Sequence, residues 1–189
     1  MIKRFLLVLA ALLPVSAAQP GSTPVAHYGS HQIAAGKTAP LPDSKVTPGV
    51  ADPVAVADLS KSPHMVDGVE RNLCAADFHT EPIRNSIVDF EKLKKEVCIE
   101  YGVTSCDASV EGDHLISLEN GGCKDCLKNL WPQPKNEEGV VVGFETKDIV
   151  ENRTHALICE GKITLDQGQR GLAGDWYQFA VDQGILPAK

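Results

Sequence analysis

The chain has 189 residues, of which 43% are hydrophobic, 5% aromatic and 23% charged. This is the composition of a soluble globular protein, and the length allows one domain of ordinary size with an appended segment. The formal net charge of −7 excludes a protein that coats nucleic acid through an overall basic surface, although it leaves room for a local basic patch.

The N-terminal segment predicts export. Residues 1–18 combine a charged start at Lys3 and Arg4, a short apolar run over 5–15 and the small residues 16–18, which suit a signal-peptide cleavage site. A retained membrane anchor is the alternative, but the apolar run is shorter than the about 20 residues that a span needs. We therefore expect a secreted or periplasmic protein without a membrane span in its mature chain.

The cysteines agree with this compartment. An even number of cysteines in an exported chain favours disulfides, and we prefer a pairing of Cys74 with Cys159 that ties the front of the domain to its last helices. The rival interpretation is a zinc site at the Cys123–Cys126 CxxC, but no second CxxC or His pair at a related spacing is present. The six cysteines are Cys74, Cys98, Cys106, Cys123, Cys126 and Cys159.

The composition divides the rest of the chain into two parts. Residues 19–65 are rich in Ala, Pro, Gly, Ser and Thr without a sustained period, and we predict a flexible, disordered linker there. His27 and His31 lie in it, where solvated side chains are the usual outcome and a metal role is the alternative. Residues 66–183 are expected to form a small α+β domain.

The first half of this domain predicts a helix followed by short extended pieces. Apolar residues recur at three- and four-residue spacing over about 87–101, which indicates an amphipathic helix. Short apolar pieces follow at Val110 and over 115–118, and the sequence Asn-Gly-Gly at 120–122 marks a tight turn. An extended path is expected over 129–132 because proline disfavours helix in the residue before it.

The second half predicts two helices. The first covers about 146–160 and ends at Gly161. Thr164 and Gln167 form a capping box for a last helix that continues through about residue 180.

One stripe of the 146–160 helix is polar. At about 100° per residue, Asp148, Asn152, His155 and Cys159 fall on the same stripe. Such a stripe is often a solvated face, but an oxidised Cys159 would need a partner chain segment covering it. We therefore favour a site between this helix and the extended pieces. The apolar side of the helix carries Ile149, Val150, Ala156, Leu157 and Ile158.

Asp113 and His114 are the residues that suggest a chemistry. Metal-assisted phosphodiester hydrolysis needs a base that accepts a proton from water near neutral pH, and an imidazole with a pKa of about 6.5 suits this task. It also needs a divalent cation held by carboxylate, amide or imidazole ligands. Adjacent residues point to opposite faces of a straight strand, but at a strand end both could reach one site.

These residues belong to a larger resemblance. Asp113-His114-Leu-Ile, the Gly-Gly at 121–122, Asn129-Leu-Trp-Pro and a later helix bearing His155 resemble the HNH (ββα-metal) nuclease motif, and more narrowly exported bacterial HNH-like proteins. The resemblance covers about residues 66–180. It implies a small ββα-metal core with flanking helices, stapled by disulfides.

The resemblance also implies roles. His114 would be the general base, and Asp113 and His155 would hold one divalent ion, commonly Mg²⁺ in this family, with Zn²⁺ or Ni²⁺ as alternatives. Asn129 would brace the loop and keep His114 oriented, and Asn152 is the alternative helix ligand. Lys147 or Arg153 would contact phosphate. In each case a plainer role is open: His114 as a buried, satisfied histidine and Asn129 as a turn cap.

The sequence departs from the family pattern at three places. Ser117 stands where the family often has proline, and an acidic insertion over 136–139 lengthens the connection to the helix. That acidity would repel a polyanion. Cys123 and Cys126 precede Asn129 and are expected to staple the loop rather than to form a zinc knuckle.

The expected function is that of an exported metal-dependent endonuclease acting on DNA or RNA, with nucleic acid as the partner. The alternative is a non-catalytic, disulfide-stapled binding or envelope module that keeps the ββα shell. A zinc-clasp interaction protein is a third interpretation, and it requires free thiols. The sequence leaves the choice of DNA or RNA and any immunity partner open.

Overall fold

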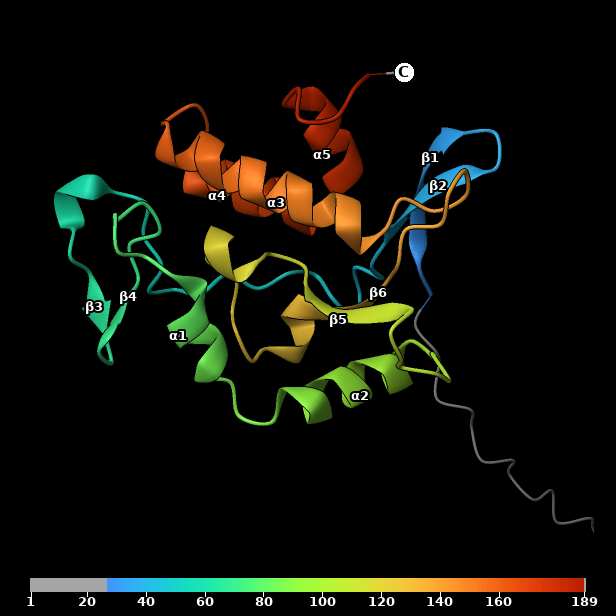
Figure 1. Ribbon diagram of the computed structural model, residues 1–189, viewed down its shortest axis with the longest axis horizontal. Coiled ribbons are helices and arrows are strands. Elements are labelled where there is room, and N and C mark those ends of the chain that lie inside the picture. Colours follow the sequence, from blue (N-terminus) through green and yellow to red (C-terminus); the bar gives the residue numbers. More distant parts are fainter. Residues whose placement is uncertain (1–26, 189) are drawn as a thin grey trace, which may run out of the picture.

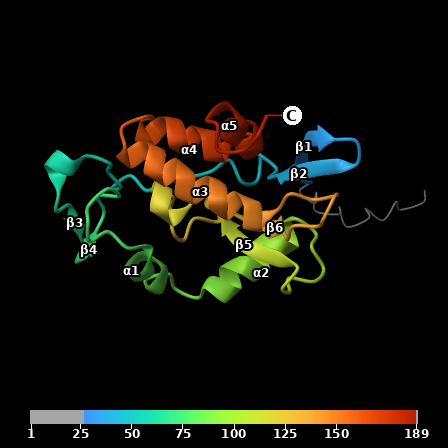
Figure 2. The same cartoon turned by 45° about the horizontal axis from the view of Figure 1, so that its top comes forward.

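A two-stranded antiparallel hairpin lies at the centre of the fold, between helices on two sides (Figure 1). The structure is a computed structural model that describes residues 27–188, so the predicted signal peptide over 1–18 lies outside the described residues. The hairpin joins β5 (Val110–His114) to β6 (Leu130–Pro134), and Asp113 lies opposite Trp131 in its register. Helices α3 (Phe144–Cys159), α4 (Leu165–Ala173) and α5 (Trp176–Asp182) lie on one side of it. Helix α2 (Phe90–Glu100) lies along the other side, with α1 (Thr80–Asn85) next to it, as Figure 2 also shows.

Helix α2 (Phe90–Glu100) packs the hairpin from one side. The amphipathic pattern predicted it, and its buried face contributes Val97, beside Tyr101, to an apolar cluster with Leu115, Leu130 and Trp131. Trp131 is fully buried, as expected for a core residue. The helix begins after Asp89, whose side chain accepts a hydrogen bond from the Lys92 amide, and the chain leaves it at Gly102.

Helix α3 (Phe144–Cys159) covers the other side and confirms the helix expected over 146–160. Val150, Leu157 and Ile158 are buried as predicted, but Ile149 is 57% exposed, so its assignment to the core is wrong. Lys147 and Glu151 are buried in its place. The helix therefore turns a partly charged face toward the hairpin.

The C-terminal segment forms two helices rather than one. The predicted Thr164–Gln167 capping box is present at the start of α4 (Leu165–Ala173). The chain then breaks at Gly174, and the Asp175 carboxylate caps α5 (Trp176–Asp182) by accepting from the Gln178 amide.

The predicted flexible linker is wrong for the part that the structure describes. Strands β1 (Gly29–Ala34) and β2 (Lys37–Leu41) pair as an antiparallel hairpin whose Ile33 and Ala39 are buried against α3, α4 and α5. The indole of Trp176 donates to Pro40 O at 3.0 Å. His31, expected to be solvated, places Nδ1 2.7 Å from the Asp175 carboxylate. These tertiary contacts bury side chains in a segment whose small-residue composition had indicated disorder.

Shorter elements complete the fold. The segment just after the acidic insertion docks on β2, where the Thr38 amide donates to Val140 O and the Val142 amide donates to Thr38 O. It does not line the cavity described below. The remaining elements are β3 (Met65–Val66), β4 (Val69–Glu70), α1 (Thr80–Asn85) and the 3₁₀ turns η1 (Leu59–Lys61), η2 (Leu118–Asn120) and η3 (Leu127–Asn129).

The segment over 115–118 is not a strand, contrary to the extended piece expected there. It belongs to the 115–129 loop, and its backbone groups are used within that loop. Gly121 adopts a left-handed φ of 73°, and a Cβ on Gly122 would lie 1.7 Å from Ile116 O. The tight turn predicted from Asn-Gly-Gly is therefore present, and it needs glycine at both positions.

All six cysteines are paired. Cys74 bonds Cys159, as preferred from the sequence, Cys98 bonds Cys106 and Cys123 bonds Cys126. The thiols that a zinc site or a zinc clasp would require are therefore not free. Three disulfides suggest an oxidising extracellular or periplasmic environment. Within residues 27–188, no helix combines the length and apolar character needed to cross a bilayer.

Candidate functional site

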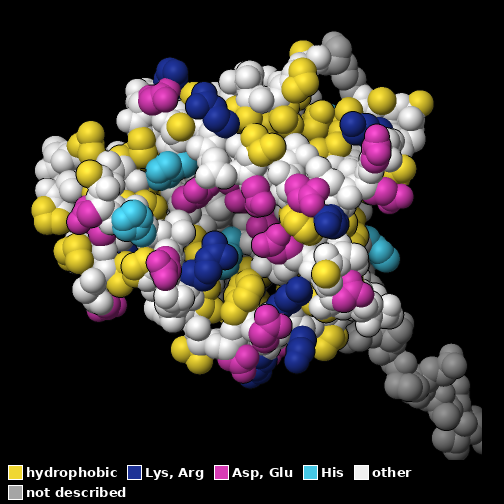
Figure 3. All heavy atoms as spheres, viewed as in Figure 1, with side chains coloured by type: hydrophobic (Ala, Val, Ile, Leu, Met, Phe, Trp, Pro, Cys, Tyr) yellow, Lys and Arg dark blue, Asp and Glu magenta, His cyan; other side chains and the backbone are white. Residues whose placement is uncertain are grey.

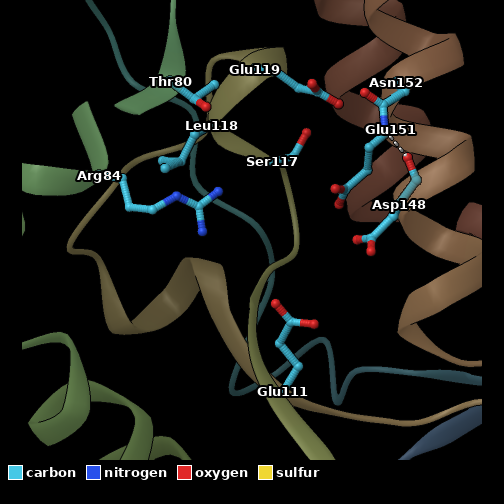
Figure 4. Close-up of a pocket in the computed structure, with 9 residues that line it drawn as sticks. All are labelled: Thr80, Arg84, Glu111, Ser117, Leu118, Glu119, Asp148, Glu151 and Asn152. Atoms are coloured by element: carbon cyan, nitrogen blue, oxygen red, sulfur yellow. Dashed lines mark hydrogen bonds between the residues drawn. The ribbon is translucent and has the colours of Figure 1, made fainter. Parts of the chain in front are cut away.

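A cavity of about 290 Å³ opens between α1, η2, β5 and α3; we call it the acidic cavity. A smaller recess adjoins it and extends to Asp113 and His114; we call it the inner recess. Figure 3 shows acidic side chains gathered around a hollow on this face. The acidic cavity is lined by Thr80, Arg84, Glu111, Ser117, Leu118, Glu119, Asp148, Glu151 and Asn152 (Figure 4).

Helix periodicity places one wall of the acidic cavity. Asp148, Glu151 and Asn152 are three and four residues apart, so they lie on one face of α3. Glu111 from β5 and Glu119 from η2 extend toward the same space (Figure 4). The Asn152 side-chain NH₂ donates to Asp148 O at 2.7 Å, which leaves its amide oxygen as an acceptor.

These acids are held in an environment that opposes their negative charge. Burial, followed by the charges of Asp113 and Asp148, raises the pKa of Glu111. Burial and the nearby Asp113 charge also raise the pKa of Asp148, and burial raises that of Glu119. Within residues 27–188, no ion pair neutralises Glu111, Glu119 or Asp148. A bound cation would relieve this unfavourable charge.

Lys147 does not contact the cavity and cannot reach a phosphate, contrary to the role expected for it. Its side chain is 1% exposed, and its ammonium lies 2.7 Å from Asp113 Oδ2, pairs with Glu151 and donates to His114 O at 3.1 Å. Burial opposes the charged form, but the charges of Asp113 and Glu151 outweigh it and raise the Lys147 pKa. This cation fixes α3 to the end of β5. Arg153, the other expected phosphate contact, lines neither space.

His114 is buried, and contacts with two other groups hold its ring in one orientation. It is 7% exposed, stacks on Phe90 with ring centroids 5.8 Å apart, and lines the inner recess. Its Nε2 lies 2.8 Å from Lys124 O, and because a carbonyl only accepts, Nε2 carries the hydrogen. The neutral ring therefore keeps an unprotonated Nδ1. Burial lowers the His114 pKa, which favours this neutral form.

Asn129 braces the loop that holds His114, as the resemblance implied. Its Oδ1 accepts from the Ile116 and Val50 amides at 3.0 and 3.2 Å, and its NH₂ donates to Ile116 O and Cys123 O at 2.9 and 3.1 Å. The side chain is fully buried and lines neither space. Asn129 therefore holds the 115–129 loop together, and the structure does not place it among the groups that could contact a substrate in the acidic cavity or the inner recess.

Asp113 lines the inner recess but is already engaged by the protein. Its Oδ2 accepts from Lys147 Nζ at 2.7 Å and from Trp131 Nε1 at 3.0 Å. Both bonds use the same oxygen, so Oδ1 is the atom that Asp113 could offer to an ion. Asn152, the alternative helix ligand, lines the adjoining acidic cavity.

His155 does not join this group. Its Nδ1 is 2.7 Å from Glu119 O, its ring stacks near Phe78, and its Nε2 lies 3.9 Å from Cys159 Sγ. It lines neither the acidic cavity nor the inner recess. The expected sharing of one ion by Asp113 and His155 is therefore corrected: the chain segment that covers Cys159 also covers His155.

Sequence reasoning missed two kinds of residue. Glu111 lies two residues before Asp113 and was given no role, and Asp148 was placed on the polar stripe of the 146–160 helix but was not named as a ligand. Arg84 and Thr80 come from α1, which carries no motif. Only the fold brings that helix to the acidic cavity.

The acids of the cavity do not form a closed cluster of the kind that surrounds a structural metal ion. Within residues 27–188, Cys123, Asp125 and Cys126 are the one group of three such side chains whose ligand atoms lie within 4.8 Å of one another, and its two sulfurs share a disulfide. The cavity acids stand farther apart. Mg²⁺ is commonly bound in this way, through one or two carboxylates with water and substrate phosphate completing its shell.

Comparisons with known proteins give no match: no family model, no curated protein and no solved structure is similar to this chain.

Proposed function

We propose that this protein is an exported metal-dependent endonuclease that hydrolyses phosphodiester bonds of DNA or RNA. The observation that carries the proposal is the fixed tautomer of His114, whose Nδ1 is left as a base beside a cavity lined by carboxylates. The pairing of β5 with β6 and the later helix α3 supply the element order that a ββα core would need. The three disulfides are compatible with export.

The residues present fit a divalent cation, although not with the ligands expected from the sequence. Glu111, Asp148 and Asn152 offer oxygen atoms in the acidic cavity, and Asp113 offers Oδ1 in the inner recess. Oxygen donors suit Mg²⁺. His155 is not part of this proposed set. When bound, the cation would neutralise negative charge on the phosphate and on the departing oxygen.

The chain's own residues account for the proton transfer. His114 Nδ1 accepts a proton from a water molecule, the water oxygen forms a bond to phosphorus, and the P–O3′ bond breaks. The departing 3′-oxygen then takes a proton from solvent. The Nε2 hydrogen bond to Lys124 O orients the ring and stabilises the imidazolium that forms. Phe90 restricts access of water to the ring face.

The first experiment measures plasmid nicking by the wild-type protein against Mg²⁺ concentration, with chelator as the baseline. We expect nicking that depends on Mg²⁺, and a higher Mg²⁺ requirement for Asp148→Asn, because the variant loses a charged oxygen ligand. Asp166→Asn removes an equal charge from the exposed side of α4 and is the matched control.

Protein stability gives a second readout of the same site. In chelator, Asp148→Asn should unfold at a higher temperature than wild type at neutral pH, because it removes a charge that the fold opposes. In the wild-type protein the folded-state pKa of Asp148 is raised. The Asp148 charge therefore destabilises the fold above that pKa, and this destabilisation disappears as the pH falls below the pKa of Asp148 in the unfolded chain. Added Mg²⁺ should stabilise wild type more than the variant. Neither cleavage nor ion binding with any divalent metal would instead indicate the non-catalytic module.

A further inference from the structure

Arg84 is the one basic side chain lining the acidic cavity, and no hydrogen bond or ion pair within residues 27–188 engages its guanidinium. Figure 4 shows it extending from α1 into the space between Glu111 and the acids of α3. It also lines the inner recess, beside His114. The fold thus places an uncommitted cation directly across the cavity from a wall of acids.

No acidic side chain within residues 27–188 forms an ion pair with Arg84. Lys147 on α3 is already paired with Asp113 and Glu151. Arg84 lowers the pKa of Glu111, Glu119 and Asp148 through its charge, but it lies against none of them. A guanidinium that closed on one of these acids would block the cavity. The space between the two walls remains available for a group that both walls could bind.

A phosphodiester has the chemistry that this space requires. One non-bridging oxygen could accept the paired N–H groups of a guanidinium while the other faces a cation on the acidic wall. Thr80 lies one turn before Arg84 on the same face of α1, lines the acidic cavity, and offers a hydroxyl as a further donor.

We propose that Arg84, assisted by Thr80, binds the substrate phosphate and positions it between the carboxylate wall and His114. The inference deepens the proposed nuclease function and rests on it. Arg84 contacts the phosphate of the backbone and no base, so it serves DNA and RNA alike and carries no sequence preference. The overall acidity of the chain makes this local cation more important for holding a polyanion.

The test compares Arg84→Gln, Arg84→Lys and Arg153→Gln. Arg153 is exposed on α3 and lines neither space, so its substitution changes the net charge equally without touching the site. Binding of labelled single-stranded DNA and RNA oligonucleotides is measured in the His114→Ala protein at constant Mg²⁺ and varied KCl. Kinetics of cleavage are measured with His114 present.

We expect Arg84→Gln to weaken binding and raise KM at least about tenfold, because a charge-assisted contact to phosphate is lost. The slope of log affinity against log salt should become shallower by about 0.7, the value for one phosphate contact on a single strand. The Mg²⁺ requirement should not rise, because removing a nearby cation favours metal binding. Arg84→Lys should recover binding only in part, and Arg153→Gln should resemble wild type.

Equal behaviour of Arg84→Gln and Arg153→Gln would overturn the inference, as would full recovery by lysine, which keeps the charge but not the paired donors. An effect confined to one base sequence would also contradict it. The binding arm requires no cleavage. If wild type binds oligonucleotides through Arg84 but never cleaves them, the proposed reaction fails and the phosphate contact remains; if it cleaves without needing Arg84, only this inference fails.

Discussion

His114 and His155 make similar local contacts but face different parts of the molecule. Each imidazole stacks near a phenylalanine, Phe90 or Phe78, with interplanar angles of 17° and 19°. Each places one ring nitrogen within 2.8 Å of a backbone carbonyl. Yet His114 lines the inner recess, whereas the second nitrogen of His155 faces the sulfur of Cys159.

A fixed, stacked imidazole is therefore not by itself evidence for a catalytic base. What distinguishes His114 is the space beside it and the acids that line that space. A disulfide adjoins each histidine: Cys123–Cys126 encloses the carbonyl that binds His114, and Cys74–Cys159 lies against His155. The two disulfides therefore allow the two regions to be perturbed separately.

The largest expected effect is on stability, at the His155 region. Replacing Cys74 and Cys159 with alanine opens a crosslink between residues 85 apart in sequence. The free energy of unfolding should fall by about 2–4 kcal/mol, measured by denaturant titration. Below the unfolding transition, Mg²⁺-dependent nicking should stay close to the wild-type rate. Loss of nicking by a folded variant would show that the His155 region is part of the catalytic site.

The next effect is on activity, at the His114 region. Replacing Cys123 and Cys126 with serine frees the loop whose Lys124 carbonyl orients the imidazole. We expect nicking to fall roughly 10–100-fold, the usual cost of losing an orienting partner, with a modest change in stability because the closed loop is short. Serine at Cys98 and Cys106 is the matched control for a short disulfide. Equal activity of the two variants would contradict the orienting role of this loop.

The smallest effect is on the pH profile. Burial lowers the His114 pKa, and the proposed base works only when unprotonated. On the acidic side of the pH profile, the nicking rate should therefore fall only below the ordinary histidine pKa of about 6.5, so that activity persists at pH 6.5. Rate measurements across pH at saturating Mg²⁺ test this. A fall in rate that begins above the ordinary value would show that another group controls the reaction.

Local patterns predicted those parts of the fold whose signal is local. Periodicity identified α2 and α3, the capping box at Thr164 was correct, and the preferred Cys74–Cys159 pairing is confirmed. The β1–β2 hairpin was missed because its small residues acquire their burial only from helices more than a hundred residues away.

The site was predictable only where it is continuous in sequence. Asp113 and His114 are adjacent in the sequence, and both line the inner recess. The choice between His155 and Asp148 depends on which segment covers each turn of α3, and the use of Lys147 as a buried counterion depends on its depth in the core. The contribution of Arg84 could not be predicted, because only the tertiary fold brings α1 to the acidic cavity.

We propose that one of these two similar histidines is a catalytic base and that the other is structural. Plasmid nicking in Mg²⁺ by His114→Ala and by His155→Ala, each shown to be folded at the assay temperature, distinguishes the two roles. We predict a loss of about 10²–10⁴-fold for His114→Ala and a rate near wild type for His155→Ala. Equal rates for the two variants, or a greater loss for His155→Ala, would contradict the claim.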